Sequence, residues 1–192
     1  MDDRGGGFSR NHYFNGKMLT AEDFQAEQDY NIGKRRLLNR CLYGSRIVCG
    51  LTVKINGRYI FVDGGLAIDC CGREIYVPSS GRITLPKQGD VCFLTISYRE
   101  FGTDPIPIPT FPEDPQQERF EHSRIRESFK LGWATENPLK EHEWRDGAWV
   151  TCGKSHSLGL AQVASKQGRF SVNKVFAKKI HAGRTCWCKG KG

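Results

Sequence analysis

The stretch from Gly44 to Tyr98 alternates short apolar runs with turn residues, and this rhythm constrains the fold more than any other feature of the sequence. Asn56 and Gly57 form a typical type I′ hairpin signal between two such runs. Short strands at regular spacing are typical of antiparallel sandwiches and barrels. We therefore expect an antiparallel β-sandwich or barrel, with strands near Ile47–Cys49, Leu51–Ile55, Tyr59–Val62, Leu66–Ile68, Glu74–Val77, Ile83–Leu85, Val91–Tyr98, Ser128–Leu131, Leu158–Ser165 and Phe170–Phe176.

One long helix is predicted before the strands, from about Ala21 to about Tyr43. Thr20 suits the N-cap, and Asp23 stands three residues later, where the acidic partner of a capping box belongs. Gly44 suits the position just past the helix C-terminus. Apolar residues cover only part of the helix circumference, which favours a helix that lies across a sheet or against a neighbouring subunit.

The remaining segments are arranged around the helix and the strands. Residues 1–18 are expected to form an irregular arm, residues 19–44 the capped helix and residues 45–176 the β domain. Five of the eight prolines fall within residues 102–117, so we expect an extended excursion there rather than a packed element. Residues 177–192 are a basic tail that contains cysteines. The predicted fold class is mainly β, with the arm and helix in front.

The formal net charge is +8, and the excess lies in the last quarter of the chain. The segment Gly147–Gly192 contains nine basic residues and no acidic ones. Such an end can bind nucleic acid, an anionic membrane or an acidic protein surface, or can be a solvated tail. The mean hydropathy of −0.53 argues against a membrane-spanning protein, and the N-terminus shows no signal-peptide core. We expect a cytoplasmic protein without direct membrane insertion.

Eight cysteines are many for such a chain, and in the cytosol we expect them to be thiols, mostly buried. Two spacings stand out: the adjacent Cys70 and Cys71, and Cys186 with Cys188 downstream of His181. Neither is the C-x2-C pair that is typical of zinc sites. The default expectation is no cofactor. The alternative is a zinc site at His181, Cys186 and Cys188, completed by a more distant cysteine.

No catalytic constellation is recognised in the sequence. None of the five histidines lies in a zinc-protease motif, and neither a nucleophile elbow nor a phosphate-binding loop is present. The sequence shows no local sign of the histidine or helix N-terminus that would activate a catalytic cysteine. Asp69, Arg73 and Glu74 are interpreted as an ion-pair set around a turn rather than an acid/base pair. The sequence therefore predicts a protein that is not an enzyme.

The stretch from Tyr13 to Tyr30 resembles the N-terminal signature of phage-tail-like baseplate proteins, in particular the type VI secretion baseplate adaptor family, TssK. The matching positions are Gly16, Met18, Leu19, Phe24, Gln25, Gln28 and Tyr30. Leu38–Gly44, Val48–Val53 and Gly65–Pro78 are similar to proteins of contractile injection gene clusters. The resemblance covers about residues 13 to 100, with a weaker similarity at Gly159–Val163. The chain departs from the adaptor in its shorter length, its cysteines and its basic tail, so membrane docking is not carried over.

The resemblance implies a β-sandwich like the shoulder of phage receptor-binding proteins, which attaches to the baseplate wedge and often trimerises. It implies a non-catalytic structural subunit of a contractile injection system or phage-tail-like particle. The expected partners are other baseplate, sheath or tube subunits and further copies of the chain, with no small-molecule substrate. From the residues, we expect partner contacts from the arm, the helix and the Pro-rich excursion, at Tyr13, Phe14, Met18, Leu19, Phe24, Tyr30, Arg35, Arg36, Arg40, Ile106, Ile108 and Phe111.

Two other functions remain as hypotheses. The first is a module that binds nucleic acid or another polyanion, since basic residues from Lys166 to Lys191 are interleaved with Phe170, Phe176 and Trp187. No known nucleic-acid motif accompanies that pattern. The second is a zinc- or redox-active enzyme that uses the cysteine clusters.

Overall fold

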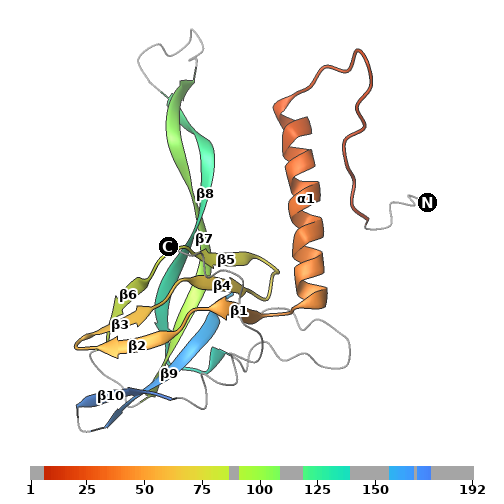
Figure 1. Ribbon diagram of the computed structural model, residues 1–192. Helices are drawn as coiled ribbons and strands as arrows, with labels where there is room; N and C mark the ends of the chain where they lie inside the picture. Colours follow the sequence, from red (N-terminus) through yellow and green to blue (C-terminus); the bar gives the residue numbers. More distant parts are fainter. Residues whose placement is uncertain (1–6, 87–90, 109–118, 139–155, 167, 174–192) are drawn as a thin grey trace, which may run out of the picture.

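The computed structural model describes residues 7–86, 91–108, 119–138, 156–166 and 168–173 (Figure 1). The predicted helix is α1 (Ala21–Leu42), and it precedes strands that pair antiparallel throughout the described ranges. The expected mainly β class is thus confirmed. The strands are β1 (Arg46–Gly50), β2 (Val53–Asn56), β3 (Tyr59–Val62), β4 (Gly65–Ile68), β5 (Glu74–Val77), β6 (Gly81–Thr84), β7 (Val91–Ile108), β8 (Arg119–Ala134), β9 (Leu158–Lys166) and β10 (Arg169–Val172).

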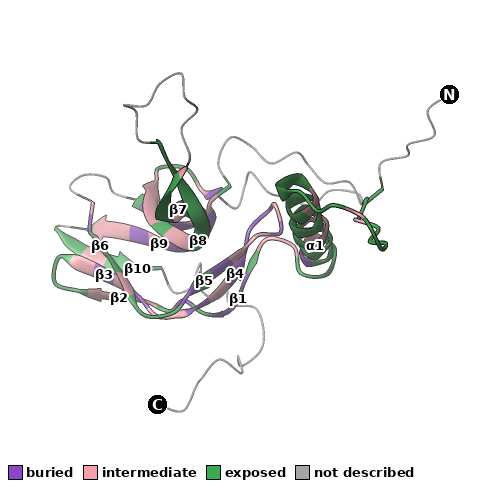
Figure 2. Cartoon of the chain, turned by 90° about the horizontal axis from the view of Figure 1, so that it is seen from above, coloured by how far each residue is buried: buried purple, intermediate pink, exposed green. Residues whose placement is uncertain are grey.

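The strands form two layers. One layer is a curved surface made of two three-stranded sheets, with the orders β1-β4-β5 and β2-β3-β6. The other is a four-stranded sheet with the order β10-β9-β7-β8. In Figure 2 the curved layer wraps under β9, β7 and β8 as a half-barrel. The hydrophobic core lies between the layers, where Leu51, Ile60, Ile75, Leu94, Ile96 and Leu160 are almost completely buried.

The curved layer bends where the chain passes from one of its sheets to the other. This crossing occurs twice, between β1 and β2 at Gly50 and Leu51, and between β3 and β4 at Gly64 and Gly65. The two crossings are paired, because the Leu51 N–H donates to the Gly64 carbonyl at 3.2 Å. Gly50 has a φ of +66°, and a Cβ there would stand 2.1 Å from the Gly64 oxygen. Only glycine fits this crossing, which lets one long hairpin contribute to both sheets.

The hairpin predicted at Asn56 and Gly57 is present, but the type I′ assignment is wrong. Asn56 pairs with Tyr59, so the two loop residues are Gly57 and Arg58. A type I′ turn needs positive φ at both loop residues, whereas only Gly57 has it, at +58°. Glycine at the first loop position fits a type II′ turn instead. The register is one residue later than the Asn-Gly pair indicated.

Strands β7 and β8 continue beyond the sheet as a two-stranded ribbon (Figure 1). Strand β9 pairs with β7 only as far as Ile96, whereas β8 follows β7 out to the pair Ile108–Arg119. The first part of the Pro-rich segment is therefore extended, as expected, and also paired, which the prolines did not indicate. Pro105 and Pro107 are two residues apart, so their missing N–H groups both belong on the outer edge of β7 and leave the ladder with β8 intact. Residues 109–118, including Phe111, lie outside the described ranges.

The helix begins where its capping box predicts. The Asp23 carboxylate accepts the Thr20 backbone N–H at 3.1 Å and pairs with Lys17 at 2.8 Å. These two contacts lower the pKa of Asp23, the Lys17 contact most strongly. At the other end, Gly44 takes a φ of +63° and donates its N–H to the Asn39 and Arg40 carbonyls. No helix in the part of the chain that the structure describes is long and apolar enough to cross a membrane.

One expectation about the cysteines is corrected. Cys49, in β1, is disulfide-bonded rather than a thiol. Its burial is as expected, since the side chain is 6% exposed. Cys41 and Cys92 carry thiols, and burial raises the pKa of Cys92.

Candidate partner-binding surface

The N-terminal arm folds back along α1. The Asn11 side-chain amide donates to the Asp23 carbonyl, and the Tyr13 hydroxyl donates to the Glu27 carboxylate. Further along the helix, the Phe8 ring packs edge-on against Tyr30, with 6.3 Å between the ring centroids. The contacted helix residues recur every three or four positions, so the arm covers one stripe of α1. Arm and helix form one unit beside the β layers (Figure 1).

Most of α1 is exposed to solvent. Asn39 is its only buried residue. Several large apolar side chains of the arm–helix unit stand out, and Met18 is 84% and Leu42 67% exposed. The others with large exposed fractions are Phe8, Tyr13, Phe14, Leu19, Phe24, Ile32, Leu37, Leu38 and Tyr43. A surface helix of a globular protein usually buries an apolar stripe against the core. So many exposed apolar side chains on one helix and its arm are therefore unusual for a chain that acts alone.

The C-terminal half of α1 is attached to the turn between β4 and β5 by polar contacts. The Asn39 amide donates to the Gly72 carbonyl at 3.0 Å and to the Glu74 carboxylate at 3.1 Å. Arg35 pairs with the same carboxylate at 3.7 Å. The helix backbone lies so close that a Cβ on Gly72 would stand 2.1 Å from the Arg36 carbonyl oxygen. The helix is thus held at one end by a few specific contacts rather than by apolar packing.

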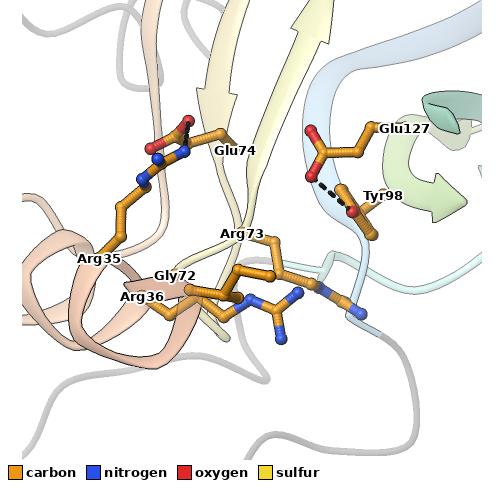
Figure 3. A pocket seen from close by; sticks show the side chains of 8 residues that line it. Arg35, Arg36, Gly72, Arg73, Glu74, Tyr98 and Glu127 are labelled. Carbon is orange, nitrogen blue, oxygen red and sulfur yellow. Dashed lines mark hydrogen bonds and ion pairs between the residues drawn. The ribbon is translucent and has the colours of Figure 1, made fainter. Parts of the chain in front are cut away.

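A small open hollow of about 40 Å³ lies at this junction (Figure 3). Its lining includes Arg35 and Arg36 from the helix, Arg73 and Glu74 from the turn and start of β5, and Tyr98 from the ribbon base. Such a volume holds only a few water molecules. The hollow therefore marks where three parts of the chain meet, and its size does not match that of a ligand site.

Tyr98 is the most perturbed acid at the junction. Its hydroxyl lies 3.0 Å from a carboxylate oxygen of Glu100 and 3.0 Å from one of Glu127 (Figure 3 draws the second contact). Burial and these two acceptors raise the pKa of Tyr98 well above its ordinary value. The Arg73 guanidinium stands over the ring, 5.1 Å from its centroid. Tyr98 thus remains a neutral donor that ties β7 to β8.

The ribbon presents a second set of exposed apolar side chains. Ile125 is 72% exposed, and Phe101, Ile106 and Phe120 are exposed to a lesser degree. The chain's own contacts in this region are polar, such as the Asp104–Arg124 ion pair at 3.3 Å. The ribbon therefore has no apolar core of its own among the described residues.

The structure places the predicted contact residues as follows. Tyr30 is half-buried under Phe8, Arg36 and Arg40 are half-buried, and Ile108 is half-buried on the ribbon. Arg35 is exposed but already pairs within the chain. Their roles toward partners stay predictions. The remaining predicted residues among the described ones, Tyr13, Phe14, Met18, Leu19, Phe24 and Ile106, are all exposed.

The turn between β4 and β5 brings together a group that the sequence did not indicate. The predicted Asp69–Arg73 ion pair is confirmed at 2.6 Å, whereas Glu74 contacts α1 instead. Partial burial acts to lower the pKa of Arg73, yet this pKa is raised, because the Asp69 carboxylate and the thiolate forms of Cys71 and Cys70 favour the charged guanidinium. His156, which precedes β9, lies beside both thiols. Nothing in the spacing of these residues along the chain signals that contact.

The zinc site and the polyanion-binding segment that were considered for the C-terminal tail fall largely outside the described residues. His181, Cys186 and Cys188 are all beyond residue 173. Of the basic and aromatic residues from Lys166 onward, Lys166 and Arg169 are exposed at the β9–β10 hairpin. Phe170 packs against the hydrophobic core. That aromatic therefore belongs to the fold rather than to a stacking surface for bases.

No protein-family model matches the chain, and no curated protein matches it in sequence. Solved structures do match it in fold. A chain of the type VI secretion system TssK-TssF-TssG baseplate subcomplex superposes with a TM-score of 0.52 and 10% identity, over 87% of this chain and 60% of that one. A chain of the type VI secretion baseplate complex gives 0.51 and 10%, over 87% and 58%.

A crystal structure of TssK is also similar, with a TM-score of 0.46 and 12% identity, over 87% of this chain and 41% of that one. The chain thus spans about three fifths of the two baseplate chains or less. At 10% identity the likeness is one of fold. The resemblance read from the sequence is therefore supported by the structure: this chain shares its fold with chains of type VI secretion baseplate complexes.

Proposed function

We propose that this chain is a non-catalytic structural subunit of a contractile injection system or phage-tail-like particle, acting at the baseplate through contacts with other subunits. The observation that carries the proposal is the fold likeness to a chain of the TssK-TssF-TssG baseplate subcomplex, which covers 87% of this chain. The proposed partners are other baseplate subunits first, then sheath or tube subunits. The proposed location is the cytoplasm, within the assembled particle.

The state of α1 supports a role in assembly. An isolated helix of this length is marginal in water, and helices in proteins gain most of their stability by packing an apolar face. Here the helix has 22 residues and buries one, which is polar. Its exposed apolar side chains would gain roughly 1.5–3 kcal/mol each on full burial. A neighbouring subunit that covers them would supply the packing that the β layers do not.

The proposed occupant of this surface is a second copy of the same chain. Phe24, Leu38 and Leu42 fall on one face, since 24 and 38 are about four turns apart and 42 is one turn further. Gln28, Asn31 and Arg35 lie between them on that face. A short apolar patch at each end with a polar middle suits contacts between like helices around an axis. The arm covers the neighbouring stripe of Asp23, Glu27 and Tyr30.

The assembly role is tested by purifying the tagged protein from its own host and imaging the eluate by negative stain. Co-purified sheathed tubes or baseplates are the expected result. A lone protein under conditions in which such particles are present in the lysate would refute the proposal.

The residue-level proposal is tested with matched serine variants. The oligomeric mass of purified Leu38→Ser and Phe24→Ser is compared with that of Tyr76→Ser, which removes an equally exposed apolar side chain from β5. We expect the wild type and Tyr76→Ser to form oligomers that both helix variants lose. Circular dichroism checks that all the variants remain folded. Equal oligomer formation by all four proteins would remove the helix from the interface.

A further inference from the structure

A cluster of one histidine and two cysteines lies at the turn between β4 and β5. The Cys70 and Cys71 sulfurs stand 3.5 and 3.4 Å from Nδ1 of His156. All three donor atoms lie within 4.8 Å of one another. The histidine comes from the segment that enters β9, 85 residues further along the chain than Cys71. The fold, rather than the local sequence, brings this group together.

The spacing matches a tetrahedral zinc site. Zinc binds thiolate sulfur at roughly 2.3 Å and imidazole nitrogen at roughly 2.0–2.1 Å, so two such ligands at a tetrahedral angle are separated by roughly 3.6 Å. Both sulfur–nitrogen distances in the cluster are within a few tenths of an ångström of that value. We propose that Cys70, Cys71 and His156 bind a zinc ion. The proposal does not depend on the baseplate role.

The turn holds the two thiols in place. The Asp69 carboxylate accepts the backbone N–H groups of Cys71 and Arg73, both at 2.9 Å, and its own backbone N–H donates to the Arg73 carbonyl. Asp69 is 1% exposed and its charge is compensated by Arg73. The carboxylate is therefore committed to shaping the turn. The site then needs little rearrangement to accept an ion.

Charge and accessibility select the metal. Two thiolates bring two negative charges, which a divalent ion neutralises, and a set of sulfur and imidazole donors favours zinc over calcium or magnesium. Cys70 is buried, Cys71 half-buried and His156 exposed, so an ion can enter from the side of the histidine. The described residues supply three of the four ligands that zinc usually takes.

Such an ion would link three parts of the fold. The turn is already attached to α1 through Gly72, and His156 leads into the opposite layer. Zinc would connect the curved layer to the four-stranded sheet at the point where the helix is attached. Its expected consequence is a more stable junction, since an ion that binds only the folded state stabilises it.

The test is elemental analysis of the full-length protein, purified without chelator after expression with zinc. We expect about one zinc ion per chain in the wild type at this site. Cys71→Ser and His156→Gln should each lower the metal content by about one ion per chain. The control Cys41→Ser removes an exposed thiol of α1 and should leave the content unchanged. Cobalt substitution should give a thiolate-to-metal absorption band that Cys71→Ser weakens.

Three results would overturn the proposal. One is a wild-type protein without stoichiometric metal. Another is an equal zinc content in Cys71→Ser, His156→Gln and the wild type, which would place the ion elsewhere. The last is a Cys70–Cys71 disulfide in protein purified with zinc and without oxidant, detected by the loss of two hydrogens in the intact mass. Circular dichroism of the two variants, whose substituted side chains are not fully buried, separates loss of metal from loss of fold.

Discussion

Asn39 offers a direct test of how α1 is attached to the β layers. We predict that Asn39→Ala weakens the attachment of the helix without unfolding the sandwich. The substitution removes the hydrogen bonds to the Gly72 carbonyl and the Glu74 carboxylate, at 3.0 and 3.1 Å. Loss of the first bond leaves the buried Gly72 carbonyl without this donor. Loss of the second bond removes a contact to the charged Glu74 carboxylate. The hydrophobic core cluster includes no residue of α1, so it should be unaffected.

The magnitude follows from the two bonds. A hydrogen bond to a neutral group contributes about 0.5–1.5 kcal/mol and one to a charged group about 1.5–3 kcal/mol, with the partly exposed Glu74 at the low end. The expected loss is about 2–3 kcal/mol in the free energy of helix attachment. Because about 1.4 kcal/mol is a factor of ten, the opening equilibrium should shift about 30- to 150-fold.

Amide hydrogen exchange measures this shift. Exchange should accelerate in the C-terminal half of α1 and stay unchanged in β3, β7 and β9. The matched control is Asn31→Ala, because the Asn31 side-chain amide donates to the Glu27 carbonyl of the same helix, at 2.9 Å, rather than to the β layers. Equal exchange of α1 in the two variants would refute the idea that Asn39 holds the helix.

Three further predictions concern other sites. Gly72→Ala should destabilise the fold by at least about 2 kcal/mol more than Gly57→Ala in chemical denaturation, since both have positive φ but only Gly72 faces backbone within 2.1 Å. Tyr98 should contribute stability that is complete below pH 10 and falls as the pH rises further, because its pKa is raised in the folded state and the unfolded chain loses the proton first. Tyr98→Phe should therefore show a shallower loss of stability above pH 10, and an unchanged slope would contradict this. The polyanion hypothesis predicts binding to single-stranded nucleic acid that weakens steeply with salt, so absent or salt-independent binding would reject it.

Local signals in the sequence were sufficient for the helix and for most turns. The capping pair Thr20–Asp23 and Gly44 act within a few residues, and the helix ends lie within one residue of the expected positions. Strands were also expected near Leu158–Ser165 and Phe170–Phe176, and β9 and β10 lie at these positions. The turn at Gly57 shows the limit of this approach, because the flanking strands choose the register and moved the loop by one residue.

Long-range pairing was not accessible from the sequence. The pairing of Pro105 with His122 and of Pro107 with Phe120 depends on β8, which the chain reaches only after residues 109–118. The prolines predicted an unpaired excursion because proline lacks the backbone N–H that a strand donates. The outer edge of a strand, however, tolerates the loss of that N–H. The disulfide of Cys49 was missed because the expectation relied on the compartment rather than on geometry.

Only part of the candidate metal cluster could be identified from the sequence. The adjacent Cys70 and Cys71 stood out as a spacing, and Asp69–Arg73 was recognised as an ion pair. His156 carries no mark of its own, because a single histidine before a strand is compatible with many roles. Only the packing of β9 against β7 and of β5 near β8 brings it to the turn.

The two prolines of the ribbon also determine how it can associate. An unpaired strand edge is a template for another strand, and natural proteins protect such edges from aggregation. Beyond Ile96 the outer edge of β7 is not paired among the described residues, and Pro105 and Pro107 remove two of the N–H donors that a docking strand would need near the end of the ribbon. Main-chain pairing by a foreign strand, or by another ribbon, is therefore disfavoured at that end of the edge. Recognition there must rely mainly on side chains, so the prolines protect the most exposed part of the ribbon from edge-to-edge growth.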